Sequence, residues 1–376
     1  MFKIQTYFNY ILIIILLIAC AFLYNRYEDK LAREEPTDVS VILQRYMLTQ
    51  DSLADTKKPI LWIHINREYN SRNWLSFGSR SSLDLNQPYM SLTIRSIVNQ
   101  CADSFHICMI DDDAFSKLLP NWSINMTSIS SPILDYIRFM GCAKLLYMYG
   151  GMIVPPSFLC MRNLINMYEH GTSKNEMFLC ENIDRNITST SYDFYPNMRF
   201  MGAQQNAHVM GEFIEYIQRL ISSDFTSQAE FLGDMNRWCN SRIKNHKITL
   251  IGGKLVGVKT MDDQPILVDN LLSNEYIDIY PDTYGIYIPA DEILNRRHYE
   301  WFARLSPKQV LESQIIISKY ILLASAPDSS RGVIEPMYTK PNWVGYFKTD
   351  LLPDLWGLRP LMTNDRATPS KRNHIQ

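Results

Sequence analysis

The sequence predicts an α/β domain with a mixed, mainly parallel sheet flanked by helices, placed after an N-terminal transmembrane helix. Two apolar runs typical of buried strands, at 59–65 and 105–110, alternate with a predicted helix at 89–100. An apolar helix at 133–149 and a short strand at 152–154 follow them. Strands and helices that alternate at this spacing are typical of parallel sheets with right-handed crossovers.

The N-terminal apolar run covers residues 10–24 without interruption, and Tyr7 and Phe8 extend it. As a helix, this stretch would reach roughly 27 Å, about the thickness of a bilayer core. Aromatic residues at both ends are typical of membrane interfaces. We therefore interpret 1–24 as a single-pass membrane anchor. A cleaved signal peptide and a buried helix of a soluble protein are the alternatives.

The side of the membrane on which the domain lies is left open by the sequence. Lys3 precedes the apolar run, whereas several basic residues mixed with acidic ones follow it between 25 and 35. The positive-inside rule would place the domain in the cytosol. Three Asn-X-Ser/Thr sequons, at Asn121, Asn125 and Asn186, would fit a glycosylated lumenal domain.

Four segments follow from the composition of the chain. They are the anchor (1–24), a charged stalk (25–57), the α/β domain (58–325) and a Pro-rich C-terminal extension and tail (326–376). Beyond the third strand, we expect strands at 176–180, 199–203, 248–251, 265–268 and 284–289. We expect helices at 114–119, 210–222, 228–244, 290–296 and 307–323.

Charge and cysteine content exclude two classes of partner. The net charge of -2 and the absence of a long basic run argue against nucleic-acid binding. The seven cysteines include no Cys-X-X-Cys pair, which argues against a structural zinc site. They can be buried thiols, or can form one or two disulfides if the domain is lumenal.

An acidic cluster, Asp111-Asp112-Asp113, directly follows the second predicted strand. Ligands of open α/β sheets bind beyond the carboxyl ends of the strands. Asp111 and Asp113 are therefore candidate ligands for Mn²⁺ or Mg²⁺, Asp111 is also a candidate substrate contact, and Asp112 is a candidate catalytic residue. The alternative is a turn that caps the helix at 114–119.

Further polar residues are expected at the same edge. Asp135 and Arg138 are spaced to share one helix face, which on spacing alone is typical of a surface ion pair. His64 and Asn66 end the first strand and are candidate contacts for a base or ribose, although a structural histidine is the alternative. Arg199 is a candidate substrate-binding cation. The segment 296–304, rich in Arg and aromatic residues, is a candidate diphosphate site or a helix with an aromatic core face.

The sequence Leu-Leu-Tyr-Met-Tyr-Gly-Gly at 145–151 resembles the helix end and glycine pair of DXD-containing, sugar-binding-region glycosyltransferases, whose relatives build capsular polysaccharide and Golgi glycans. Residues 59–66 resemble the opening strand of that class, which contacts the nucleotide. Residues 200–203 resemble a later strand that faces the sugar, which makes Gly202 a candidate substrate contact. The class also carries Asp-X-X-Arg about one helical turn closer to the glycine pair, and so on the same helix face as Asp135 and Arg138. The resemblance therefore makes Asp135 a candidate for substrate binding and Arg138 a candidate catalytic residue. The resemblance covers roughly residues 59–220. It implies a GT-A-like fold, a nucleotide-sugar donor, a glycan or protein acceptor and a lumenal domain.

The sequence departs from this class at the metal-binding motif. The class continues its glycine pair with Ile-Tyr-X-Asp-X-Asp, and alignment from Gly151 places those aspartates on Pro155 and Ser157. Neither residue replaces a carboxylate as a ligand of Mg²⁺ or Mn²⁺; Ser157 is kept as a candidate substrate contact. The sequence therefore predicts a membrane-anchored glycosyltransferase-like protein that transfers a sugar. The alternative is an inactive, membrane-tethered module that binds a glycan or a partner.

Overall fold

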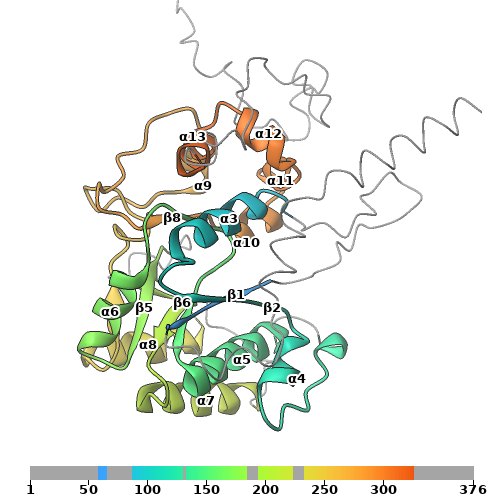
Figure 1. Ribbon diagram of the computed structural model, residues 1–376, viewed down its shortest axis with the longest axis vertical. Helices are drawn as coiled ribbons and strands as arrows, with labels where there is room; N and C mark the ends of the chain where they lie inside the picture. The colour runs from blue at the N-terminus through green and yellow to red at the C-terminus, as the bar shows by residue number, and fades with distance from the viewer. Residues whose placement is uncertain (1–57, 66–86, 130–132, 184–193, 223–232, 326–376) are drawn as a thin grey trace, which may run out of the picture. The chain divides into compact units, whose positions relative to one another are not determined.

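The computed structural model describes residues 58–65, 87–129, 133–183, 194–222 and 233–325 (Figure 1). The predicted anchor, stalk and C-terminal extension lie outside the described residues, as does Asn66. Within the described ranges, no helix combines the length and the apolar character needed to cross a membrane.

A six-stranded sheet forms the centre of the described domain, in the strand order β2-β1-β3-β6-β5-β7. Its strands are β1 (Ile60–His64), β2 (His106–Ile110), β3 (Gly151–Ile153), β5 (Met177–Asn182), β6 (Tyr195–Ala203) and β7 (Thr249–Ile251). β1 pairs in parallel with β2 and β3, and β5 pairs in parallel with β7. β6 runs antiparallel to both β3 and β5. The predicted α/β class with a mixed, mainly parallel sheet is confirmed.

This topology brings several chain segments to one edge of the sheet. The carboxyl ends of β1, β2 and β3 meet there because these strands are parallel. The beginning of β6 lies at the same edge because β6 runs antiparallel to β3, with Ile153 opposite Met201. We call this edge the carboxyl edge.

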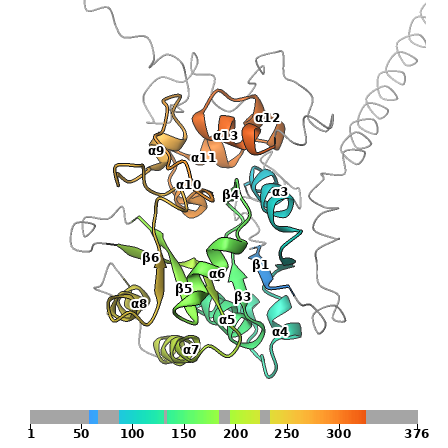
Figure 2. The same cartoon turned by 60° about the vertical axis from the view of Figure 1, so that its left-hand side comes forward.

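The helices form two groups in Figures 1 and 2. α4, α5 and α7 lie together at one end of the described domain, and α9, α11, α12 and α13 gather with α3 at the other. The longer helices are α3 (Met90–Cys101), α5 (Ile133–Tyr149), α6 (Ile165–Ser173), α7 (His208–Ile221), α8 (Asp234–Lys244) and α13 (Ile316–Ala324). The shorter ones are η3 (Met126–Ser128), α4 (Ala114–Leu118), α9 (Val268–Leu271), α10 (Ala290–Asn295), α11 (Glu300–Ala303) and α12 (Pro307–Glu312).

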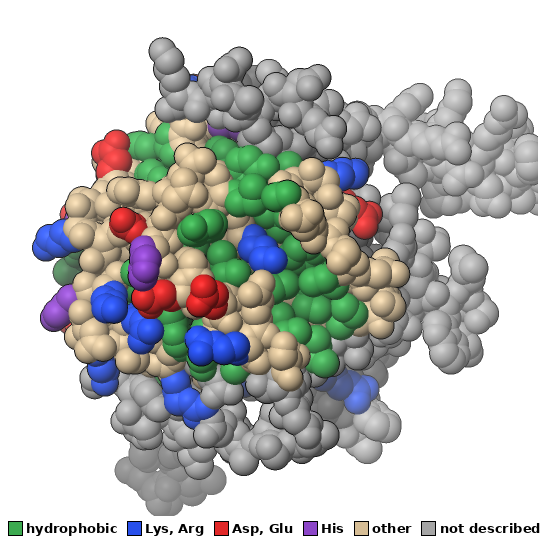
Figure 3. All heavy atoms as spheres, turned by 90° about the horizontal axis from the view of Figure 1, so that it is seen from below, with side chains coloured by type: hydrophobic (Ala, Val, Ile, Leu, Met, Phe, Trp, Pro, Cys, Tyr) green, Lys and Arg blue, Asp and Glu red, His purple; other side chains and the backbone are tan. Residues whose placement is uncertain are grey.

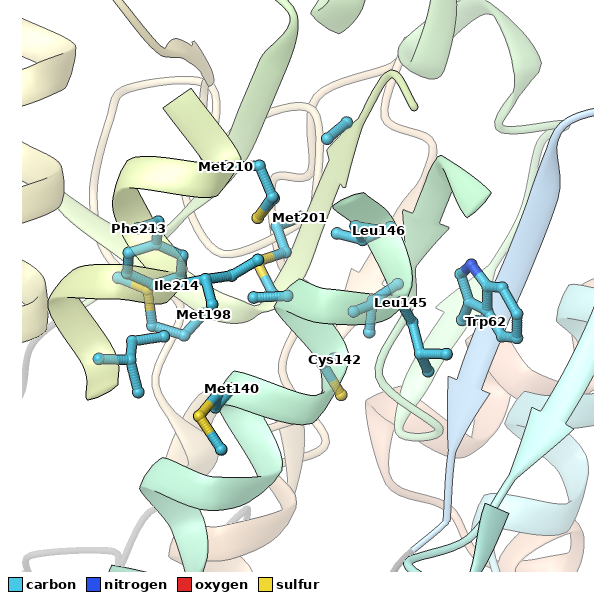
Figure 4. Close-up of a cluster of buried hydrophobic side chains, with 14 of the residues drawn as sticks. Trp62, Met140, Cys142, Leu145, Leu146, Met198, Met201, Met210, Phe213 and Ile214 are labelled. Carbon is cyan, nitrogen blue, oxygen red and sulfur yellow. The ribbon is translucent and has the colours of Figure 1, made fainter. Parts of the chain in front are cut away.

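Each group of helices has its own hydrophobic core. The first core includes Phe213 and Ile214 of α7, which lie beside Met198 of β6, and Leu145 of α5, which lies between them and Trp62 of β1 (Figure 4). The second core lies between the helices α9, α10, α11, α12 and α13, the start of α3, and the strands β4 (Phe158–Cys160) and β8 (Gly285–Tyr287). The face seen from below carries a band of hydrophobic side chains beside charged ones (Figure 3).

The predicted glycine pair ends α5 and starts β3. The amide of Gly150 donates to the Leu146 carbonyl at 2.8 Å, and Gly150 and Gly151 have φ of 71° and 95°. These values favour glycine because a Cβ atom is strained at positive φ. Trp62, which is buried, donates from its Nε1 to the Gly150 carbonyl at 3.1 Å. The predicted helix end is therefore confirmed.

Three expectations about elements were wrong or incomplete. The single helix expected at 307–323 is two helices, because Ser313 and Ile315 have extended ψ angles of 152° and 154°. The strand expected at 265–268 is only an isolated bridge at Pro265, followed by α9. The strand expected at 284–289 exists as β8, but it pairs antiparallel with β4, which was not predicted, in a separate two-stranded sheet.

Candidate functional site

Five of the predicted site residues meet at the carboxyl edge. His64 is the last residue of β1, and Asp112 follows the end of β2 by two positions. Asp135 and Arg138 lie in the first two turns of α5, and Arg199 lies in the middle of β6. Residues that are far apart in the sequence therefore lie together at the edge where ligands of open α/β sheets bind.

Asp112 is the centre of the buried part of this group. Its Oδ1 lies 2.9 Å from Nε2 of His64, so the carboxylate accepts a hydrogen bond from the imidazole N–H. Arg138 donates from Nε to Oδ1 at 3.1 Å and from Nη2 to Oδ2 at 2.8 Å, which is a two-pronged, charge-assisted contact. The ring of His64 also stacks on Phe115, with centroids 5.3 Å apart.

The ionisation of Asp112 follows from these contacts. Burial alone would raise the pKa of Asp112, but the hydrogen bonds and charges of His64 and Arg138 outweigh burial and lower this pKa from 3.8 to about 2. A carboxylate with so low a pKa is a weak proton acceptor near neutral pH. The geometry therefore gives Asp112 an electrostatic role, holding Arg138 and His64, rather than acid–base chemistry.

Arg138 has a different partner from the one expected. The surface ion pair with Asp135 was the alternative interpretation, but the Arg138 side chain is only 8% exposed and its two short contacts go to Asp112. Its Nη1 lies 3.8 Å from Asp135 Oδ1, a longer contact. Arg138 is thus a buried cation that depends on a carboxylate from another strand end.

Arg199 links Asp135 to Asp291 of α10. Its Nη1 lies 2.9 Å from Oδ2 of Asp291 on α10, and its Nη2 lies 3.9 Å from Oδ1 of Asp135. Burial would lower the pKa of Arg199, but the negative charges of Asp291, Tyr287 and Asp135 outweigh it and raise this pKa. Sequence reasoning missed Asp291, because its pairing with Arg199 spans 92 positions and no local motif marks it.

Together these residues form what we call the ionic chain: His64, Asp112, Arg138, Asp135, Arg199 and Asp291, in contact order. With His64 neutral, three carboxylates and two guanidinium groups give the ionic chain a formal charge of 2 − 3 = −1. Both arginines are already paired with carboxylates of the protein. A phosphate group would have to displace these carboxylates to reach either arginine.

The acidic cluster is not arranged as a metal site. Asp111 Oδ1 accepts from the Ala114 amide at 3.0 Å, which is the capping interaction considered as the alternative. The carbonyl of Asp113 accepts from Ser116 Oγ at 2.7 Å. Among the residues that the structure describes, no group of three or more His, Cys, Asp or Glu side chains could hold a metal ion. The residues present therefore do not fit the Mn²⁺ or Mg²⁺ site expected at Asp111 and Asp113.

The two positions aligned with the lost aspartates are buried. Ser157 is 3% exposed, and Pro155 is buried as well. The segment is held from both sides, since Pro156 accepts from Thr93 of α3 at 2.5 Å and Ser157 accepts from the Ile288 amide at 3.3 Å. We expected Ser157 to contact substrate at an open strand end, and the structure instead places it inside the domain.

Two further candidates serve packing. A Cβ atom on Gly202 would lie 2.5 Å from Cζ of Phe178, so this glycine makes room for a core ring. In the 296–304 segment, Trp301 and Phe302 are buried and Arg304 pairs with Glu300 on the same helix. Only residues 300–303 of the segment are helical, as α11, and their aromatic side chains face the core, as one of the two interpretations expected.

A shallow depression of about 800 Å³ lies at α4 and the C-terminal end of α5. It is lined by residues 116–123 together with Met148 and Tyr149, and it contains no residue of the ionic chain. The ring of Trp122 there already contacts Phe115, with centroids 5.4 Å apart, and Lys144, whose Nζ is 5.6 Å from its centroid. We therefore place the candidate site at the ionic chain and not at the depression.

Comparisons with known proteins give only remote likeness in fold. No protein-family model matches the sequence, and no curated protein matches it. The crystal structure of the apo-form glycosyltransferase GlyE of Streptococcus pneumoniae TIGR4 is similar in fold, with a TM-score of 0.37 and 11% sequence identity. The match covers 76% of this chain and 66% of that chain, just under two thirds of its length.

Proposed function

We propose that this chain is a membrane-tethered protein with a glycosyltransferase-like, GT-A-type domain that binds a glycan at the carboxyl edge of its sheet without transferring a sugar. One observation carries the proposal: Arg138 and Arg199, the two cations of the ionic chain, are each paired with a carboxylate of the protein. The burial of Pro155 and Ser157, which the resemblance aligns with the two aspartates of the class, supports it. Stabilising a leaving diphosphate needs cations that are free to face it. Here those cations face carboxylates of the protein.

The chemistry of the ionic chain suits hydroxyl groups better than phosphates. Asp135 and Arg199 are about one-third exposed and Asp291 more than half, and they alternate acceptors and donors. A sugar hydroxyl both donates and accepts, so it can bridge such neighbours without displacing an ion pair. The formal charge of −1 would repel a nucleotide diphosphate. We therefore propose a neutral glycan as the ligand.

Sugar transfer is the second candidate function. His64 ends the strand that resembles the nucleotide-contacting opening strand of the class, and Asp112 lies beside it, which favours this candidate. Transfer would require Arg138 or Arg199 to leave its carboxylate and face the diphosphate. The donor would be a nucleotide sugar and the acceptor a glycan or a protein.

The membrane anchor and the side of the domain are also proposals. The apolar run at 10–24 supports a single-pass anchor, and the resemblance supports a lumenal domain, with the stalk at 25–57 between them. The partners of the chain would then be the membrane that holds the anchor and a glycan on the lumenal side, where the domain lies.

The test compares ligands on one protein. The domain of residues 58–325 is applied to an array of neutral oligosaccharides. The same domain is titrated with UDP-glucose, once with Mn²⁺ and once with EDTA. We expect binding of a neutral oligosaccharide, and neither UDP-glucose binding nor UDP release under either condition. Metal-dependent binding of UDP-glucose, with release of UDP, would establish the second candidate instead.

A pair of matched variants links binding to the ionic chain. Asp135→Asn removes the carboxylate between the two arginines, and we expect it to abolish glycan binding. Asp282→Asn removes a comparable exposed carboxylate that pairs with Arg162 at 3.0 Å outside the ionic chain. It should bind as the wild type does. Equal binding by both variants would exclude the ionic chain as the glycan site.

A further inference from the structure

Two buried cysteines face each other between α3 and β4. Cys101 is the last residue of α3 and Cys160 is the last residue of β4. Their sulfur atoms are 4.0 Å apart, and both residues have no exposed surface. All six cysteines of the described residues are free thiols in this structure.

The position of this pair is fixed by contacts other than its own. Thr93 and Ser96 lie on α3 and bind the segment that contains β4: Thr93 donates to the Pro156 carbonyl at 2.5 Å. Ser96 Oγ accepts from the Cys160 amide at 2.9 Å. These hydrogen bonds hold α3 and β4 in register, and the register places the two thiols together.

We propose that Cys101 and Cys160 are a site of covalent modification, where an intramolecular disulfide forms when the chain folds in the presence of a disulfide oxidant such as oxidised glutathione. The bond requires the sulfur atoms to approach from 4.0 Å to about 2.0 Å. The inference goes beyond the proposed function and does not depend on it.

The chemistry is two successive thiol–disulfide exchanges. The thiolate of Cys101 attacks one sulfur of the oxidant, forms a mixed disulfide and releases the first glutathione thiolate. Cys160 then gives up its proton and attacks the Cys101 sulfur, releasing the second. The two protons of the cysteines end on the two glutathione thiols, and the oxidant takes up the two electrons.

The surroundings of the thiols set the order and the timing. The hydrogen bond with Cys160 lowers the pKa of Cys101, whereas burial raises the pKa of Cys160, so Cys101 is the first nucleophile. Because both residues are buried in the folded domain, the exchange takes place while α3 docks on β4, when the two thiols already face each other but are not yet covered. Afterwards, the closed bond is shielded from reductants.

The bond would stabilise the domain. It joins residues 59 positions apart and therefore restricts a long loop of the unfolded chain. We expect the melting temperature of the oxidised protein to exceed that of the reduced protein by about 5–10 °C.

The experiment counts thiols on the full chain in detergent. The protein is unfolded with reductant, refolded with oxidised and reduced glutathione, denatured, alkylated with N-ethylmaleimide and weighed intact. We expect 7 − 2 = 5 alkylated cysteines, and a peptide map that joins the peptides of Cys101 and Cys160. Seven alkylated cysteines, or a linkage that involves any other cysteine, would overturn the inference.

Variants give the matched control. Cys101→Ser should leave all its remaining cysteines reactive and lose the difference in melting temperature. Cys239→Ser removes a buried cysteine whose sulfur contacts Met198 at 3.7 Å, and it should keep the protected pair. If Cys101→Ser does not refold, the wild-type peptide map decides alone. Equal melting temperatures of the oxidised and the reduced wild-type protein would also count against the bond.

Discussion

Alanine at Gly151 should be far more destabilising than alanine at Gly150 or Gly233, two other glycines with positive φ. Gly233, Gly150 and Gly151 have φ of 66°, 71° and 95°, so each substitution carries the strain of a Cβ atom at positive φ, about 1–2 kcal/mol. A Cβ atom on Gly233 meets nothing within 4 Å, and one on Gly150 meets the Gln205 amide nitrogen at 3.0 Å. One on Gly151 would overlap the carbonyl oxygen of Ile60 and lie 2.9 Å from its carbonyl carbon.

The cost at Gly151 follows from what must move. Ile60 belongs to β1, the central strand that pairs with both β2 and β3, so relief of the overlap must separate β3 from β1. Loss of this pairing adds to the strain, and we expect Gly151→Ala to lower the free energy of unfolding by about 4 kcal/mol or more. For Gly150→Ala we expect about 2 kcal/mol, and for Gly233→Ala about 1 kcal/mol.

The assay is urea unfolding of residues 58–325, followed by circular dichroism and tryptophan fluorescence. Gly252→Ala is the baseline, because Gly252 has no positive φ and a Cβ atom there meets nothing within 4 Å. The order Gly252, Gly233, Gly150, Gly151 is the prediction. Similar losses at Gly233 and Gly151 would refute the reasoning, because backbone strain alone would then explain both and β3 would not pack against β1 as described.

Three other predictions concern the carboxyl edge and the anchor. Asp112 has a lowered pKa, so its ionisation stabilises the fold above pH 4 and that contribution is lost as the pH falls through about 2; we expect about 1–2 kcal/mol after allowance for its partial exposure. Asp112→Asn should lose this pH dependence. Because it leaves Arg138 without its carboxylate, it should also lower the free energy of unfolding at pH 7 by about 3 kcal/mol. Urea titrations from pH 2 to pH 7 measure both effects, and a variant that unfolds like the wild type would contradict the pairing. Ser157→Asp should lower the melting temperature at pH 7 and recover part of it at pH 4, because a buried carboxylate is tolerated only when protonated; a neutral effect at pH 7 would mean that position 157 is open to water. A chain that starts near residue 50 should be soluble and folded, and sedimentation of this chain with vesicles would contradict an anchor confined to residues 1–24.

Local sequence signals predicted the first half of the fold well. The strands at β1 and β2 and the helix α5 have long apolar patterns, and Gly150-Gly151 marks the boundary between α5 and β3. The partnership of β4 with β8 could not be predicted, because each has three residues and they lie more than 120 positions apart. The break at Ser313 was missed for a related reason: apolar residues continue on both sides of it.

The sequence predicted which edge of the sheet the candidate residues His64 and Asp112 would lie on, but not which side chains would pair there. His64 and Asp112 lie at the carboxyl ends of neighbouring parallel strands, where ligands of such sheets bind, and Arg138 of α5 reaches the same edge. Spacing within α5 suggested Asp135 as the partner of Arg138, yet Asp112, 26 positions away, makes the short contacts. Helix spacing describes which residues share a face, whereas the partner of a buried cation is set by the tertiary position of a carboxylate.

The burial of Pro155 and Ser157 and the pairing within the ionic chain can be described together. Residues 154–157 connect β3 of the central sheet to β4 of the second sheet, and the Val154 amide donates to the Trp62 carbonyl at 2.9 Å before the segment turns inward. Carboxylates at 155 and 157 would be buried there without a metal. The positive charges of Arg138 and Arg199 are paired with carboxylates of the protein itself. Asp112, Asp135 and Asp291 supply these partners, which keeps the cations in place at the edge and occupies the groups that a diphosphate would need.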